Sequence, residues 1–132
     1  MNFLAMADDV IVVSTPNLAA TLDAYGVVKV IRETRLAARV HLLVNHADGA
    51  AQAEGVLGRI STCARQFLQF EPANLGFLPR DSAIETSGQN RTPLVLAAPE
   101  HESARRFSAL ARQLLDARPA TEEPAPPCSA AA

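Results

Sequence analysis

The sequence predicts an α/β fold with a short parallel sheet, flanking helices and three layers. Residues 10–13 (Val-Ile-Val-Val) and 40–44 (Val-His-Leu-Leu-Val) are apolar runs without polar alternation, which is typical of strands buried on both faces. The residues between them have helical periodicity. Residues 8–45 are therefore expected to form a βαβ unit with a right-handed crossover.

The first helix is expected to begin at the Ser14-Thr15-Pro16 break. Thr15 is a suitable N-cap, and Pro16 suits the first turn because its missing N–H needs no partner there. Apolar side chains then recur at three- and four-residue steps. The apolar residues that share one helix face are Leu18, Leu22, Tyr25, Val28 and Ile31.

A second helix and a third strand follow. The loop 46–49 offers Asp48 as a helix cap, and Glu71-Pro72 ends the helix because proline pushes the preceding residue out of the α region. The apolar positions expected to face the core are Ala53, Val56, Leu57, Ile60, Ala64, Phe67 and Leu68. Residues 75–78 form a short apolar run, the expected third strand, which Pro79-Arg80-Asp81 closes.

The C-terminal third is expected to add two helices. Asp81 or Ser82 can cap a short helix that ends near residues 88–90, and residues 92–96 are expected to be extended, at the sheet edge or under the last helix. The last helix is expected to run from Glu100 to about Ala117. The residues on its inward face are expected to be Ala104, Phe107, Leu110, Ala111, Leu114 and Leu115. It can dock on the fold or lie on a membrane surface; its Ala-rich face with one aromatic favours docking.

The chain is expected to divide into an α/β domain at residues 1–117 and a tail at 118–132. The tail is rich in proline and alanine and has too little apolar surface to offset the cost of ordering, so disorder is expected. Residues 2–7 are expected to be the end of a helix that begins upstream.

Composition excludes several function classes. Twelve basic and fourteen acidic residues give a net charge of −2, without the basic field of a nucleic-acid-binding protein. Cys63 and Cys128 have neither metal-ligand spacing nor a disulfide pattern, and the N-terminus is not a signal peptide or a membrane span. These features predict a cytoplasmic protein in a reducing compartment.

Ligands of parallel α/β sheets bind at the carboxyl ends of the strands, here residues 14–17, 45–48 and 79–81. The Asn45 carboxamide offers the donor and acceptor that an adenine edge requires, although a strand-ending Asn is more often a loop cap. Pro79 can form an apolar wall of a purine slot, and Asp81 can accept an exocyclic N–H. A plain turn with a helix cap explains the Pro-Arg-Asp segment equally well.

Other chemistry finds little support in the sequence. His41 is expected to be packed in a strand, while His46 and His101 have no carboxylate or Cys at metal spacing, so no metal site is expected. No Gly-x-x-x-x-Gly-Lys loop is present, and Lys29 is the only lysine of the chain. No catalytic residue is assigned, and phosphoryl transfer by this chain alone is not expected.

Several segments together resemble the MinD/ParA-type P-loop ATPases of the SIMIBI class. Residues 7–17 and 21–30 are similar to the middle of these proteins, above all to flagellar-number regulators of the FlhG/FleN type. Leu43-Val44-Asn45 resembles the strand whose terminal Asn contacts adenine, and residues 76–81 resemble the Gly-x-(Ile/Val)-Pro-x-Asp segment that closes over the base. Residues 91–94 and 104–111 are similar to the family's C-terminal ending.

The resemblance implies the C-terminal half of such an ATPase. It places the adenine side of an ATP site at Asn45, Pro79, Arg80 and Asp81, with Mg²⁺ bound only where the other half of the site is supplied. The segments that resemble the family contain neither Walker A nor Walker B, so the enzymatic status of the chain stays open. The resemblance also implies that Asp23 lies on a face that partner proteins or the dimer mate contact.

The implied role is spatial or numerical control of flagella or a related partitioning task. Implied partners are a second copy, a full-length MinD-like ATPase and flagellar assembly proteins, with peripheral contact to the inner membrane through them. An alternative is a stand-alone, non-catalytic interaction module derived from such an ATPase. A receiver-like domain is a third reading, but Ser14-Thr15-Pro16 does not supply the acidic cluster that it needs.

Overall fold

The structure is a computed structural model that describes residues 6–34 and 37–117. Its elements follow in the order β1 (Asp9–Ser14), α1 (Leu18–Glu33), β2 (Arg39–Ala47), α2 (Ala50–Leu68), β3 (Ala73–Pro79), α3 (Ser82–Gln89), α4 (Leu94–Ala97) and α5 (Glu102–Asp116). The expected tail at 118–132 lies outside the described residues, as does most of the helix end expected at residues 2–7.

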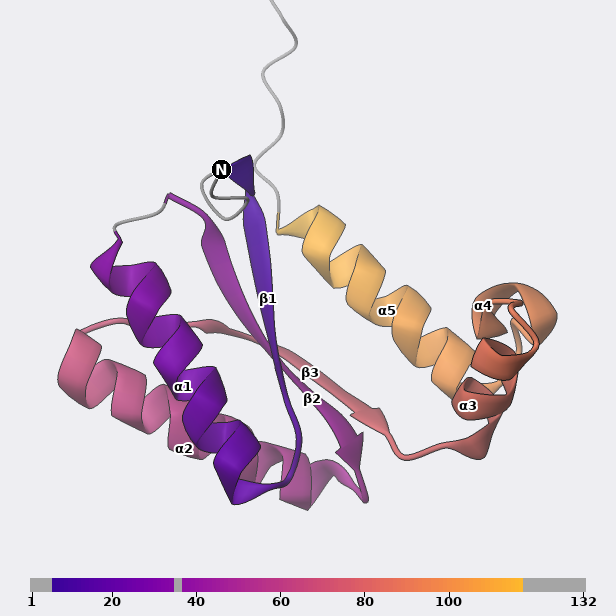
Figure 1. The fold of residues 1–132 in the computed structure, drawn as a ribbon. Coiled ribbons are helices and arrows are strands. Elements are labelled where there is room, and N and C mark those ends of the chain that lie inside the picture. Colours follow the sequence, from indigo (N-terminus) through magenta and orange to yellow (C-terminus); the bar gives the residue numbers. More distant parts are fainter. Residues whose placement is uncertain (1–5, 35–36, 118–132) are drawn as a thin grey trace, which may run out of the picture.

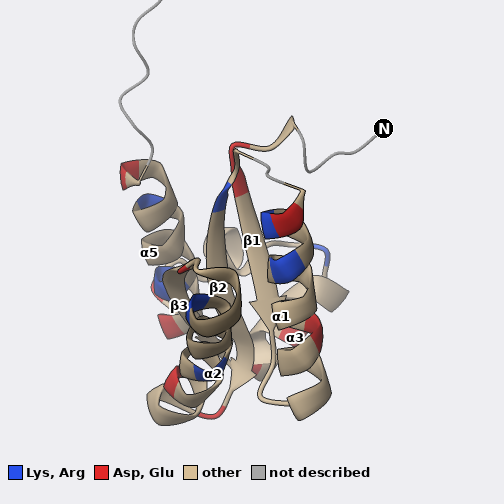
Figure 2. Cartoon of the chain, turned by 90° about the vertical axis from the view of Figure 1, so that its left-hand side faces the viewer, with Lys and Arg blue, Asp and Glu red and all other residues tan. Residues whose placement is uncertain are grey.

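The strands form one parallel sheet with the order β1-β2-β3. Helices α1 and α2 cover one face, and α5 lies on the other side of the sheet (Figures 1 and 2). The predicted α/β class with a short parallel sheet and flanking helices is therefore confirmed.

The main core lies between the sheet and the helices α1 and α2. Its most deeply buried members are at most 1% exposed and come from three elements. They are Val28, Leu42, Val44, Ala47, Ala53, Ile60 and Ala64. Burial of such β-branched and leucine side chains is the principal stabilising contribution in a domain of this size.

The prediction that β1 is buried on both faces is wrong. Val10 and Val12 pack under the helices, but Ile11 is 41% exposed and Val13 is 53% exposed. The physical reason is the position of α5, which packs on β3 and leaves the same face of β1 without a helix in the described part. The described fold therefore buries only part of the apolar run of β1.

Helix α1 differs from the prediction in its cap and in half of its buried face. Asn17, not Thr15, is the N-cap, and its Oδ1 accepts a 2.8 Å hydrogen bond from Ala19 N. The buried positions are Thr21, Ala24, Val28 and Ile31, whereas Leu18 and Leu22 are 65% and 62% exposed. Since α1 carries apolar residues on more than one side, periodicity alone did not identify the stripe that faces the sheet.

Helix α2 follows the prediction more closely. Five of the predicted core positions are buried, but Phe67, in the last turn, is 67% exposed. Gly49 occupies the N-cap without a side-chain hydrogen bond, so the prediction of Asp48 as cap is wrong. Strand β2 continues through His46 to Ala47, where a loop was expected.

The C-terminal elements pack around β3 and α5. Residues 94–97, expected to be extended, form the short helix α4, which packs on α5. Helix α5 buries Ser103 and Ala104, while Leu115 is 63% exposed and Ala111 is exposed, contrary to prediction. The Arg106 guanidinium lies over the Phe77 ring, 4.7 Å from its centre, so this arginine helps to hold α5 against β3.

A charged cluster joins the amino ends of β1 and β2. Arg39 donates from Nε and Nη2 to the two Asp9 oxygens at 2.9 and 2.8 Å, and His41 Nε2 lies 2.8 Å from Asp9 Oδ1. The hydrogen bonds from Arg39 and His41 lower the pKa of Asp9 to about 2. His41 is 5% exposed, which confirms the expectation of a packed histidine.

Candidate functional site

The carboxyl end of β2 is irregular at the residues that the sequence marks as a site. The register between β2 and β3 shifts between Val44 and Ala47, and His46 has a φ of 57°. Asn45 Oδ1 accepts a 2.9 Å hydrogen bond from His46 N, which holds this bulge locally. Bulges of this kind redirect side chains at the ends of strands, often beside binding sites.

The structure brings the 45–48 and 79–81 segments side by side. Ala47 pairs with Pro79, and Arg80 N donates to the Ala47 carbonyl at 3.1 Å. The Arg80 side chain then reaches across to Asp48, with Nε 3.7 Å from Oδ1. Strand pairing therefore positions the two segments that the sequence analysis assigned to one purine slot.

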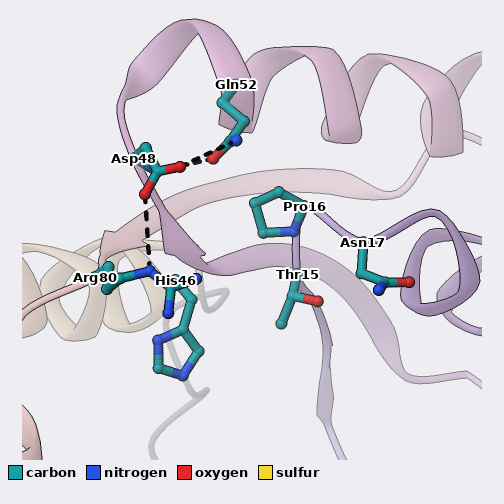
Figure 3. Close-up of a pocket in the computed structure, with 7 residues that line it drawn as sticks. All are labelled: Thr15, Pro16, Asn17, His46, Asp48, Gln52 and Arg80. Atoms are coloured by element: carbon teal, nitrogen blue, oxygen red, sulfur yellow. Dashed lines mark hydrogen bonds and ion pairs between the residues drawn. The ribbon is translucent and has the colours of Figure 1, made fainter.

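A pocket of about 370 Å³ opens at these strand ends (Figure 3). It lies where the ends of β1, β2 and β3 and the first turn of α2 meet. Its lining consists of Thr15, Pro16, Asn17, His46, Asp48, Gln52 and Arg80. Of the four predicted nucleotide residues, Arg80 alone lines the pocket among the described residues. Asn45 and Pro79 lie in β2 and β3 outside this lining, and Asp81 is the N-cap of α3.

Gln52 is a lining residue that the sequence analysis did not select. Its Oε1 accepts from Asp48 N at 2.8 Å, and its Nε2 lies 3.4 Å from Asp48 Oδ2 (Figure 3). This reciprocal pair resembles a capping box and fixes the entrance to α2. The spacing of Asp48 and Gln52, four residues apart at the start of a predicted helix, is the sequence pattern that could have identified this pair.

Asp81 has a structural role in the described fold. Its Oδ1 accepts from Ala83 N at 2.9 Å, which caps α3, and its Oδ2 accepts a hydrogen bond from the fully buried Ser103 hydroxyl. The hydrogen bond from Ser103 and, to a smaller extent, that from Ala83 N lower the pKa of Asp81. His101 Nδ1 lies 3.6 Å away, so the carboxylate connects α3 to the start of α5.

Two polar side chains of the β2 bulge, those of Asn45 and His46, have hydrogen-bonding capacity that the described structure does not use. His46 Nδ1 is buried without a hydrogen-bond partner in the described structure. The Asn45 carboxamide uses its oxygen on His46 N, and its NH₂ group makes no hydrogen bond to the described residues. A purine edge presents donors and acceptors that can satisfy such groups.

The same lining offers little to a triphosphate. Among the residues that the structure describes, Arg80 is the single Lys or Arg side chain of this lining, and no glycine-rich loop of the Walker type occurs in the sequence.

The remaining sequence candidates lie elsewhere. Asp23 is exposed on α1 and lines a second hollow beside β1 rather than the pocket. Within residues 6–34 and 37–117 no group of three or more His, Cys, Asp or Glu side chains is arranged to hold a metal ion. None of the described helices has the length and apolar character needed to span a membrane.

The chain is similar to known proteins in sequence and in fold. No family model matches the chain. The antiactivator FleN of Pseudomonas aeruginosa is 22% identical over 114 residues, which cover 86% of this chain and 41% of FleN. The MinD cell division protein of Aquifex aeolicus superposes with a TM-score of 0.68 at 16% identity, over 91% of this chain and 49% of MinD.

The predicted resemblance to MinD/ParA-type ATPases is confirmed. The chain has a MinD-like fold and is similar to FleN along most of its length, and it spans less than half the length of either protein. A structure of the MinC:MinD complex of Aquifex aeolicus also matches, with a TM-score of 0.62 at 16% identity, over 89% of this chain and 46% of that protein. MinD thus occurs in a complex with another protein.

Proposed function

We propose that this chain forms the adenine side of an ATP site within a MinD/ParA-like assembly. On this proposal it corresponds to the C-terminal part of such an ATPase, and the phosphate-binding groups and Mg²⁺ come from polypeptide outside the present sequence. The chain alone binds the base and does not hydrolyse ATP.

The bulge at Asn45 and His46 is the observation that supports the proposal most directly. It leaves a buried imidazole nitrogen, His46 Nδ1, without a hydrogen-bond partner in the described structure, beside a pocket at the carboxyl ends of parallel strands. Unsatisfied buried polar atoms are uncommon in proteins and call for a partner. A purine in this position supplies one.

The other predicted residues have separable roles in this proposal. Pro79 pairs with Ala47 outside the pocket lining, and Arg80 lines the pocket while its backbone holds β3 to β2. Asp81 lies beyond the pocket lining and fixes the turn after Arg80 through its bonds to Ala83 and Ser103. When bound, ATP supplies the phosphoryl group that a complete assembly would transfer.

The biological setting proposed here is control of flagellar number or placement. Its support is the similarity to FleN, together with the flagellar-regulator pattern of residues 7–30. Expression of the chain in a flagellated bacterium, with flagella counted by electron microscopy, tests this role. Unchanged flagellar counts at high expression would argue against it.

Nucleotide titration tests the biochemical proposal. Adenosine and ATP are added to the ¹⁵N-labelled 132-residue chain, and amide shifts are expected at His46, Ala47 and Arg80. Asn45→Ala should weaken binding by about tenfold, the factor that corresponds to about 1.4 kcal/mol for a lost base contact. Asn74→Ala, an exposed carboxamide at the opposite end of the sheet, is the matched control. Absence of saturable shifts with either ligand would refute the proposal.

A second candidate function is that of a non-catalytic interaction module. The observation that favours it is the exposure of Ile11 and Val13, because large apolar side chains on a strand face commonly mark a binding surface. This function does not require nucleotide.

A further inference from the structure

The junction between α3 and the start of α5 contains a histidine with two competing partners (Figure 1). His101 is the N-cap of α5, and the Ser103 N–H donates to His101 Nδ1 at 3.3 Å. The same ring nitrogen lies 3.6 Å from Asp81 Oδ2, at the cap of α3. This nitrogen therefore faces both a hydrogen-bond donor and a carboxylate, and it can serve only one of them at a time.

The protonation state of the ring decides which partner Nδ1 binds. An imidazole nitrogen accepts a hydrogen bond only when it carries no proton. Because the Ser103 N–H donates to Nδ1, the capping form of His101 is the neutral ring with its proton on Nε2. A proton added to Nδ1 ends this hydrogen bond and makes Nδ1 a charged donor, for which the Asp81 carboxylate is an acceptor of opposite charge.

A histidine at this position gives the helix cap a property that the usual caps lack. Ser, Thr, Asp and Asn are the preferred N-caps, and none of them changes its charge between about pH 5 and about pH 8, whereas histidine does. The His101 side chain is 38% exposed, so it exchanges protons with the solvent. The hydrogen bond at the start of α5 therefore depends on pH.

Asp81 is held in place to receive the charged ring. The Ser103 hydroxyl donates to Oδ2, and Ala83 N donates to Oδ1 at 2.9 Å. The hydrogen bond from Ser103 is the main cause of the lowered pKa of Asp81, so this carboxylate stays ionised while histidines titrate. Neither bond involves His101, and the acceptor is in position in both states of the ring.

The other charges around the junction are paired with one another or exposed. Strand β3 and helix α4, which pack against α5, have no charged residue. Glu100 pairs with Arg105, and Glu102 pairs with Arg106. The charged residues of α3 and of the loop after it that remain are Glu85 and Arg91, and both are exposed. Within the described part of the chain, Asp81 is thus the acid that forms an ion pair with His101.

We propose that His101 is a pH-operated switch at the junction of α3 and α5. The neutral ring caps α5 through Ser103 N, and the protonated ring releases this cap and pairs with Asp81. The proton passes between the solvent and Nδ1, and no covalent bond between heavy atoms changes. Since Asp81 directly follows Arg80, which lines the strand-end pocket, the switch acts on the connection between that segment and α5. It does not depend on nucleotide binding.

A pH titration of the ¹⁵N-labelled full chain without nucleotide tests the switch. Spectra are recorded from about pH 8 to about pH 5, the range in which histidines take up a proton. At the high end, long-range spectra of the ring should show the proton of His101 on Nε2. As the ring becomes charged, the Ser103 amide resonance should move. Its protection from hydrogen exchange, corrected for the intrinsic rate at each pH, should fall about fivefold, the loss expected for one N-cap.

Two variants and a control separate the two partners. His101→Asn supplies a favoured cap that does not titrate, so Ser103 should no longer respond to pH. Asp81→Asn keeps a cap on α3 but removes the charge; at about pH 5, side-chain couplings of His101 should report one rotamer in the wild type and several in this variant. His46→Asn replaces another histidine at a positive φ that asparagine tolerates, and it should leave the Ser103 response unchanged.

Four results would each overturn the proposal. They are a Ser103 amide that does not respond to pH in the wild type, an equal response in His101→Asn, a neutral ring with its proton on Nδ1, and equal ordering of the charged ring in the wild type and Asp81→Asn. Should Asp81→Asn not fold, about 1 M salt takes its place in the wild type, because it screens a partly exposed ion pair and should release the charged ring.

Discussion

The ion pairs of Asp9 give the clearest residue-scale prediction. The folded-state pKa of Asp9, about 2, lies below the ordinary value of 3.8 because Arg39 and His41 hydrogen-bond to the ionised carboxylate. The resulting stabilisation is complete above about pH 5 and is lost as the pH falls from 3.8 toward 2. Asp9→Asn should therefore lower the melting temperature at pH 7 and have a shrinking effect below about pH 4.

Asp8→Asn is the matched control for this prediction. Asp8 is the neighbouring acid, but its side chain is exposed and forms no ion pair with the described residues. Its replacement should change stability by less than about 0.5 kcal/mol. Thermal unfolding of the three proteins between about pH 2 and about pH 8 makes the comparison. A difference between wild type and Asp9→Asn that does not vary with pH would contradict the assignment.

Single residues were predictable where local chemistry determines them. The Asp81 cap and the packed His41 could be recognised because each depends on a few neighbours in sequence or on a short apolar run. The His46 conformation could not be recognised, since it results from the bulge that β2 forms against β3. Likewise, Asp9 acquires its partners only when β1 and β2 pair in register.

At the scale of elements, strand β3 contains a glycine that the backbone requires. Gly76 has a φ of +116°, and a Cβ there would stand 3.5 Å from Leu110 Cδ2. The contact is ordinary, so the expected strain comes from the backbone. Gly76→Ala should lower the free energy of unfolding by about 1–3 kcal/mol. Urea unfolding measures the effect.

Gly55→Ala is the control, and its predicted effect has the opposite sign. Gly55 lies within α2, and a Cβ at this position would meet no atom of another element within 4 Å, so alanine adds helix propensity without a clash. It should raise the free energy of unfolding by about 0.4–1 kcal/mol. Destabilisation of similar size by both substitutions would show that the Gly76 backbone is not the cause.

Helix α2 allows the corrected buried face to be tested. Ile60 is 1% exposed and Phe67 is 67% exposed, although the two were predicted to share the core. Ile60→Ala should cost about 2–5 kcal/mol, since it leaves a cavity beneath the sheet. Phe67→Ala should cost less than about 0.5 kcal/mol in urea unfolding. A larger loss for Phe67→Ala would mean that the end of α2 is packed.

Elements were predictable when one apolar stripe or run dominated. Helix α2 has such a stripe and was placed correctly except at its last turn, whereas the several apolar flanks of α1 left its orientation undetermined. The short helix α4 was missed because four residues are too few for helical periodicity, and its packing on α5 is a tertiary effect.

For the whole molecule, the parallel α/β class followed from unbroken apolar strands alternating with helices. What the sequence could not determine was which sheet face α5 covers, and hence that β1 remains exposed on one face and at one edge. The same limit applies to the site. The strand ends were identified, but the position of the pocket depends on the β2 bulge and on Gln52 in α2.

The distribution of charge over the whole molecule predicts the relative affinities of the chain for adenosine, ADP and ATP. In the described part of the chain, Arg80 is the single cationic residue that lines the pocket. The chain's only lysine, Lys29, is on α1, paired with Glu33 at 3.8 Å. Because no Walker-type loop is present to hold phosphates, adenosine, ADP and ATP should bind with affinities within about fivefold, the range of one exposed ion pair. Calorimetry should also show weaker binding of guanosine. Far tighter binding of ATP than of adenosine, or ATP turnover above buffer, would show that the chain holds phosphates by itself.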